Sequence, residues 1–257
     1  MDIDLSGRKA IVCGASRGLG YECASALATY HADVVVVART QSTLDEAAAR
    51  LDTLGSGSVS VVSADICSSD GQLSILATCP EPDILVTNAD GPPAGDFRDW
   101  GKQEWYAAID ANMLTPIELI KATIDGMIAR KFGRIVNITS AAVKSPIGVL
   151  GLSNGARGGL TGFVAGLARD VAKHNVTINN ILPGPFETQR LHNVLRAQAE
   201  MQSRSVEEVT TEWLEAIPSG RFGRPEEVGL ACLFLCMSGH MTGQNLLLDG
   251  GQYPGVF

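Results

Sequence analysis

Short aliphatic runs alternate along the chain with longer stretches in which apolar residues recur at helical spacing. The aliphatic runs cover residues 9–13, 33–38, 59–63, 83–87, 134–139, 176–182 and 245–249. Continuous apolar runs of this length are typical of strands buried on both faces of a parallel sheet. The longer stretches predict helices at about 18–30, 41–54, 103–130, 154–173 and 225–237.

This alternation of strands and helices predicts an α/β protein with a Rossmann-type, doubly wound parallel sheet of about seven strands. The 257 residues fit one α/β domain, so we expect residues 1–257 to form a single dinucleotide-binding unit. Residues 187–220 differ, because they are polar and helix-prone and contain no strand pattern. We expect this segment to be a lid over the ends of the strands.

Composition excludes several classes of partner. The chain has 20 Lys and Arg against 28 Asp and Glu, a formal net charge of −8, which argues against a nucleic-acid-binding surface. No apolar run approaches the roughly 18 residues of a membrane span, and the start of the chain lacks a signal-peptide pattern, so we expect a cytoplasmic protein without a membrane partner. The six cysteines form no CxxC pair, and Cys232 and Cys236 lack nearby histidines, so we expect buried thiols and no metal site.

A glycine-rich segment, CGASRGLG, follows the first predicted strand and leads directly into a helix, with Gly14, Gly18 and Gly20 in G-x3-G-x-G spacing. Glycines there allow a sharp turn and close approach to a pyrophosphate, and the helix N-terminus attracts the anion. Such glycines could also serve only to make a turn, without binding a cofactor. Their place between a strand and a helix favours a dinucleotide site.

Arg39 follows the second strand, where a fold that prefers NAD usually places an acid for the adenosine ribose hydroxyls. Together with Arg17 it could hold a 2′-phosphate through bidentate hydrogen bonds. Both arginines could instead be solvated surface charges. The pair favours NADP(H) over NAD(H).

Several ordered motifs, spread over nearly the whole chain, resemble the short-chain dehydrogenase/reductase family. They are the glycine segment, SADI (63–66), TNAD (87–90), Asn112, NITS (137–140) and PGP (183–185). The segments GRPEEVGLACLFL (223–235) and TGQNLLLDGG (242–251) look like the C-terminal part of 3-oxoacyl-[acyl-carrier-protein] reductase-like members.

The resemblance implies a set of cofactor contacts. It places along the phosphates and ribose the residues Gly14, Ser16, Arg17, Gly18 and Leu19, and beside the adenine Asp65 and Ile66. It places Asn88 and Ala89 on the nicotinamide side, and Pro183 and Gly184 over the nicotinamide ring. Each also has a purely structural interpretation, such as a helix cap, a turn or a loop.

The catalytic positions depart from the family's pattern of Ser, Tyr, Lys and Asn. Ser140 and Asn112 match, but the Tyr position falls on Ser153 and the Lys position on Arg157. A serine hydroxyl is a poor proton donor near neutral pH and arginine stays charged, so this pair cannot imitate Tyr and Lys. Arg157 could still bind the cofactor ribose. The remaining tyrosines, Tyr21, Tyr30, Tyr106 and Tyr253, lie at other points of the pattern.

We therefore expect an atypical NADP(H)-dependent oxidoreductase that reduces a small-molecule carbonyl or oxidises an alcohol, resembling 3-oxoacyl thioester reductases. Its proton donor could be Lys144, His192, Asp90 or a water held by Ser140 and Ser153; Asp90 stands where the family has a small residue, and a solvated loop is the alternative for each. The other hypothesis is a catalytically silent NADP(H)-binding module. The resemblance implies a homodimer or homotetramer built on helices 103–130 and 154–173, although their small residues could pack within the chain instead.

Overall fold

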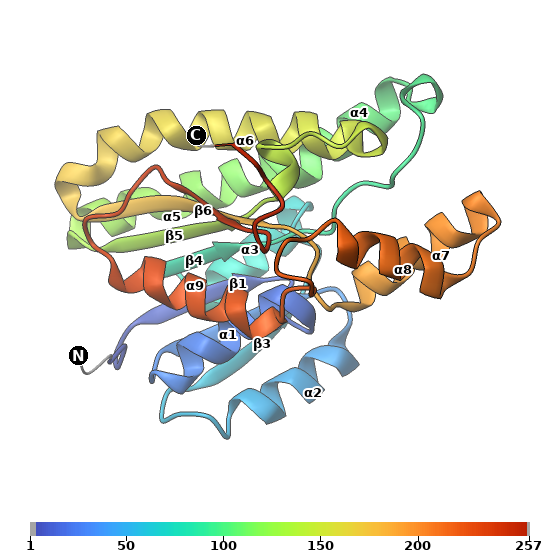
Figure 1. The fold of residues 1–257 in the computed structure, drawn as a ribbon. Coiled ribbons are helices and arrows are strands. Elements are labelled where there is room, and N and C mark those ends of the chain that lie inside the picture. Colours follow the sequence, from blue (N-terminus) through green and yellow to red (C-terminus); the bar gives the residue numbers. More distant parts are fainter. Residues whose placement is uncertain (1–3, 256–257) are drawn as a thin grey trace.

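A seven-stranded parallel sheet forms the centre of the computed structural model, which describes residues 4–255 (Figure 1). The strands lie in the order β3-β2-β1-β4-β5-β6-β7. They are β1 (Lys9–Cys13), β2 (Asp33–Ala38), β3 (Val59–Ser63), β4 (Ile84–Thr87), β5 (Gly133–Ile138), β6 (Val176–Pro183) and β7 (Asn245–Leu248). All seven predicted strands are confirmed, and no end differs from the prediction by more than one residue.

The helices confirm the predicted alternation with two differences. They are α1 (Gly18–Thr29), α2 (Gln41–Leu51), α3 (Ser69–Thr78), α4 (Lys102–Ile109), α5 (Thr115–Arg130), α6 (Gly151–Val171), α7 (Gln189–Gln202), α8 (Val206–Glu215) and α9 (Pro225–Met237). The prediction missed α3, which buries only Gly71 and Ile75 and therefore lacks a clear apolar stripe. The predicted helix 103–130 is two helices, α4 and α5, joined by a π-helical turn at Asp110–Leu114.

Two apolar cores cover the two faces of the sheet. Alternate residues of β1 point to opposite faces, so Ala10 and Val12 pack with α1, α2 and α9, whereas Ile11 and Cys13 pack with α3, α5 and α6. Figure 1 shows α5 and α6 on one side of the sheet and α1 and α9 on the other. Helices on both faces leave the carboxyl ends of the strands as the open edge of the domain.

A row of hydrogen-bonded polar side chains crosses the sheet from β4 to β7. Asn137 on β5 accepts from Thr87 Oγ1 on β4 at 2.7 Å and donates to Asn180 Oδ1 on β6 at 3.0 Å, and Asn180 in turn donates to Asn245 Oδ1 on β7 at 2.8 Å. These residues are direct partners in the strand register. Their hydrogen bonds offset the cost of burying amides in the sheet.

Residues 187–220 form α7 and α8, which extend beyond the sheet in Figure 1. Their packing produces a third apolar cluster with the residues that follow, namely Leu191, Leu195, Ala199, Val209, Ile217 and Phe222. This segment thus has a small core of its own.

All six cysteines are free, and only Cys67 is not fully buried. Within residues 4–255, no helix is both long and apolar enough to cross a membrane. Nor do three or more His, Cys, Asp or Glu side chains gather there as a metal centre would require.

Candidate cofactor and active site

The strand order reverses between β1 and β4, and the glycine-rich turn lies at that point. Gly14 and Gly18 both have φ of +60°, which favours glycine. A Cβ on Gly14 would lie 2.6 Å from Nδ2 of Asn88, and a Cβ on Gly20 would overlap the carbonyl oxygen of Gly14. Asn88 Nδ2 donates to that oxygen at 3.4 Å, which ties the end of β4 to the turn. Gly14 and Gly20 therefore let the turn pack tightly against itself and against the end of β4, and we call this turn the glycine cradle.

Two helices begin at this cradle. Arg17 is the N-cap of α1, and Thr188 is the N-cap of α7, accepting at Oγ1 from Leu191 N at 3.4 Å. A Cβ on Gly18 would lie 3.6 Å from the Thr188 methyl carbon, so α7 begins against the start of α1. Both helix N-termini favour negative charge nearby. Thr188 was not among the predicted site residues, although a threonine before an amphipathic run is a recognised N-cap signal.

The remaining predicted cofactor residues lie along the same edge of the sheet. Asp65 and Ile66 follow β3, and the Asp65 carboxylate accepts from Cys67 N at 3.0 Å. At the other end, Pro183 is buried, and Gly184 N donates to Leu248 O at 2.8 Å. Ser16 in the turn and Leu19 in the first turn of α1 are both half-buried.

Three arginines from three elements bind three consecutive residues after β4. Arg157 Nη2 donates to Ala89 O at 3.3 Å, Arg39 Nη2 pairs with Asp90 Oδ2 at 2.6 Å, and Arg190 Nη1 donates to Gly91 O at 3.3 Å. Arg157 lies on α6, Arg39 directly follows β2, and Arg190 lies on α7. In a chain of net charge −8, this edge therefore gathers positive charge, as a phosphate-rich cofactor requires.

Arg157 is buried at 8% exposure among the strand ends. Its Nη1 donates to the carbonyl oxygens of Ile138, at 2.8 Å, and Thr139, at 2.7 Å. Burial is the main reason that the pKa of its guanidinium falls to about 10; the charge of Arg190 lowers it further, and Asp90 opposes both. Arg157 remains a cation at neutral pH and holds the ends of β4 and β5 together.

The residues expected to be catalytic lie around the start of α6, which packs against both the π-helical turn and the turn after Ser140. Ser140 Oγ accepts from Ala142 N at 3.1 Å, which leaves its O–H free to donate. Asn112 lies in the π-helical turn at 4% exposure, and its Oδ1 has no hydrogen-bond partner among the described residues. Ser153 is buried on α6, one turn before Arg157.

Lys144 lies next to Tyr253, a tyrosine that its place in the sequence did not connect with the site. The Lys144 Nζ is 5.6 Å from the centroid of the Tyr253 ring. The backbone N–H of Tyr253 donates to Asp249 Oδ2 at 2.7 Å, which fixes the position of residue 253. No local sequence signal connects these residues, because only the fold brings residue 253 to the turn after Ser140. The other two proposed donors differ, since His192 is exposed on α7 and Asp90 is paired with Arg39.

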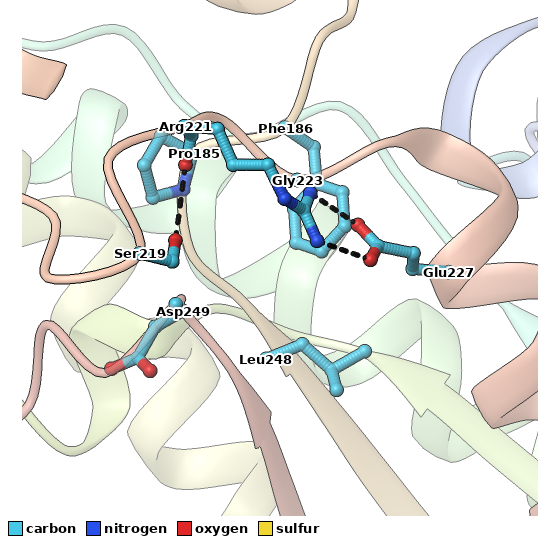
Figure 2. A pocket seen from close by; sticks show the side chains of 9 residues that line it. Pro185, Phe186, Ser219, Arg221, Gly223, Glu227, Leu248 and Asp249 are labelled. Atoms are coloured by element: carbon cyan, nitrogen blue, oxygen red, sulfur yellow. Dashed lines mark hydrogen bonds and ion pairs between the residues drawn. The ribbon is translucent and has the colours of Figure 1, made fainter.

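A cavity of about 230 Å³ lies beside this edge, between the β6–α7 connection and the end of β7 (Figure 2). Arg221 and Glu227 bind each other at its wall with hydrogen bonds of 2.9 and 2.6 Å. The Glu227 carboxylate also accepts from Arg224 N at 2.8 Å. The bond from Arg221 is the main reason, and that from Arg224 the second, that the pKa of Glu227 falls to about 2. This cavity joins the base of residues 187–220 to the Asp249 turn.

Comparisons with known proteins agree with this geometry. The short chain dehydrogenase family model matches residues 8–199. The 3-oxoacyl-[acyl-carrier-protein] reductase of Chlamydia pneumoniae is 32% identical, with 98% of this chain and 99% of that protein covered. The gluconate 5-dehydrogenase of Gluconobacter oxydans is 33% identical, with 96% and 95% covered. The structure of L-sorbose reductase from Gluconobacter frateurii, complexed with NADPH and L-sorbose, superposes with a TM-score of 0.92 at 26% identity, covering 100% of both chains. The chain is therefore a member of the short-chain dehydrogenase family.

Proposed function

We propose that this protein is an NADP(H)-dependent reductase of a small-molecule carbonyl, working in reverse as an alcohol dehydrogenase, with a proton donor other than the family's tyrosine. The observation that carries the proposal is the unpaired Oδ1 of Asn112, buried against α6. A buried acceptor without a partner costs stability unless a water or ligand binds it. A protein that only bound nucleotide would have no use for that polar atom or for the free hydroxyl of Ser140.

Carbonyl reduction adds a hydride to carbon and a proton to oxygen. Bound NADPH would supply the hydride, so the chain has to supply the proton. Ser140 orients the carbonyl oxygen through its free O–H, because its Oγ already accepts from Ala142. Ser153 is too weak an acid, and the guanidinium of Arg157, with a pKa of about 10, binds backbone carbonyls.

Lys144 is the donor that the contacts favour, with Tyr253 as its partner. The ammonium group lies at the phenol ring, four residues after Ser140. Asp249, which anchors Tyr253, also borders Gly184, since a Cβ on Gly184 would lie 3.0 Å from Asp249 Cα. Lys144 thus belongs to the segment expected beside the carbonyl, and Tyr253 is anchored by a residue that borders the segment expected beside the nicotinamide.

NADP(H) is the preferred cofactor in this proposal. Arg39 and Arg17, both exposed at the adenosine end, would bind the 2′-phosphate. Arg157 would direct its remaining Nη2 hydrogen to a ribose hydroxyl while it holds the strand ends. The other predicted contacts follow the edge from Asp65 and Ile66 to Pro183 and Gly184.

Residues 187–220 would serve as the substrate lid, because α7 meets the cradle at Thr188 and the end of β4 through Arg190. The names of the relatives suggest two substrate classes, 3-oxoacyl thioesters and keto sugars or sugar acids. We further propose a cytoplasmic homodimer or homotetramer that associates through α6. Glycines 158, 162 and 166 on that helix face open space, since a Cβ added at any of them would meet nothing within 4 Å.

The test is a fluorescence titration with NADPH and NADH, followed by addition of 3-oxoacyl thioesters and keto sugars to the NADPH complex. Substrate-dependent loss of nicotinamide absorbance supports the reductase. Tight NADPH binding without turnover on either class favours the second candidate, a silent NADP(H)-binding module, which the Ser153 and Arg157 substitutions support. Failure to bind either cofactor contradicts both.

A further inference from the structure

We propose that Asp90 determines cofactor specificity: it is the built-in counter-ion of Arg39, and the 2′-phosphate of NADP(H) has to displace it. The inference rests on the cofactor site proposed above. Because of Asp90, the chain prefers NADP(H) over NAD(H) less strongly than Arg39 by itself would make it.

The Arg39–Asp90 ion pair spans the adenosine end of the cofactor groove. Arg39 follows β2 and Asp90 follows β4, and these strands lie on either side of β1. The 2.6 Å bond between their side chains therefore crosses above the glycine-rich turn at the end of β1. A ribose bound at that turn would meet both charged groups at once.

Both side chains of the Arg39–Asp90 pair are exposed to solvent, and this weakens their attraction. Arg39 is 69% exposed and Asp90 is 80% exposed, so water and salt screen their attraction. Exposed pairs of this kind contribute little to stability, so a doubly charged phosphate can displace the carboxylate. Asp90 then remains beside the phosphate as a like charge. NADPH affinity is reduced by both effects, whereas NADH, which has no 2′-phosphate, is affected by neither.

The backbone on both sides of Asp90 is held independently of its carboxylate. Arg157 binds Ala89 O, and Arg190 binds Gly91 O. An Asp90→Asn substitution therefore removes the charge without releasing the segment. This makes the isosteric amide a clean test of the carboxylate.

The test measures dissociation constants of NADPH and NADH by fluorescence, and of adenosine 2′,5′-bisphosphate and 5′-AMP by calorimetry, for the full chain and its variants. The variants are Asp90→Asn, Arg39→Met and the control Asp96→Asn. Asp96 is a suitable control because it lies in the same connection and forms an exposed pair with Arg98 at 3.0 Å.

We expect Asp90→Asn to bind NADPH and the bisphosphate about 3- to 10-fold more tightly, with NADH and 5′-AMP within about twofold of the original protein. Arg39→Met should lose affinity for the two 2′-phosphate ligands alone, and Asp96→Asn should change nothing. Unchanged NADPH affinity in Asp90→Asn, or an equal shift for NADPH and NADH, overturns the inference while leaving the proposed reductase intact. If the unmodified chain binds none of the four ligands, the proposed function fails together with the inference.

Discussion

The buried side chain of Arg157, on α6, donates from Nη1 to the carbonyl oxygen of Thr139 at 2.7 Å. Together with its bonds to Ile138 and Ala89, this contact makes one side chain the common anchor of two strand ends. The position expected to bind cofactor thus also has a structural duty. Its effect on stability can be measured without any ligand.

Arg157→Met should lower the free energy of unfolding by about 2–4 kcal/mol, because three backbone carbonyl oxygens at the strand ends lose their donor. Urea denaturation of the ligand-free protein measures the loss. Arg169→Met, at an exposed position of the same helix, should stay within about 0.5 kcal/mol. Equal stabilities for the two variants would mean that the carbonyls find other donors.

Tyr253→Phe and Lys144→Met should each reduce kcat about 10²- to 10⁴-fold, since each removes part of the proposed proton source. NADPH affinity should remain within about twofold, because neither residue lies in the glycine cradle. Exposed residues of the same types provide controls, namely Tyr106→Phe and Lys173→Met. Full turnover in both Tyr253→Phe and Lys144→Met would assign the proton to solvent or to His192.

Gly20→Ala should weaken NADPH binding more than about tenfold and cost about 1–3 kcal/mol of stability, because the new Cβ overlaps the Gly14 carbonyl oxygen. NADPH titration and thermal unfolding measure the two effects. Gly148→Ala is the matched control, since a Cβ there meets nothing within 4 Å. A Gly20→Ala protein that binds NADPH normally would refute the cradle.

Glu227 should make stability depend on acid pH. Its pKa is about 2 in the folded chain and 4.5 in the reference state, so its contribution is complete above pH 4.5 and is lost as the pH falls toward 2. We expect Glu227→Gln to cost about 1–2 kcal/mol at pH 7, allowing for screening of this partly exposed group, and almost nothing near pH 2. Urea denaturation at both pH values is the measurement. A loss that does not change with pH would point to packing instead.

Gly162→Leu should break the proposed oligomer while leaving the fold intact, because its side chain would occupy the open space where a partner helix is expected. Light scattering should show a smaller particle with an unchanged circular dichroism spectrum. Glu46→Leu, exposed on α2 at the other face of the sheet, should keep the original mass. An unchanged mass for Gly162→Leu would assign association to another surface.

Sequence patterns predicted the strands closely because each strand is a continuous aliphatic run between polar segments. They missed α3, whose buried surface is small. They also missed the interruption between α4 and α5, because the π-helical turn at Asp110–Leu114 contains no glycine or proline to mark it. The positive φ of Gly14 and the close packing at Gly20 could be anticipated from the glycine spacing, because both depend on the backbone of one turn. The contacts of Arg39 with Asp90 and of Lys144 with Tyr253 could not, since the partners are 51 and 109 positions apart and no local pattern joins them.

The asparagine row has a consequence for how the sheet assembles. Strands made only of Val, Ile and Leu can slide by two residues and still present the same faces, so apolar burial alone discriminates poorly between alignments. Asn137, Asn180 and Asn245 can satisfy one another only in the observed alignment. A slipped strand would place an amide against an aliphatic neighbour and leave it without a hydrogen-bond partner. The row therefore selects the correct strand alignment, and it fixes the relative heights of the loops that follow β4 to β7.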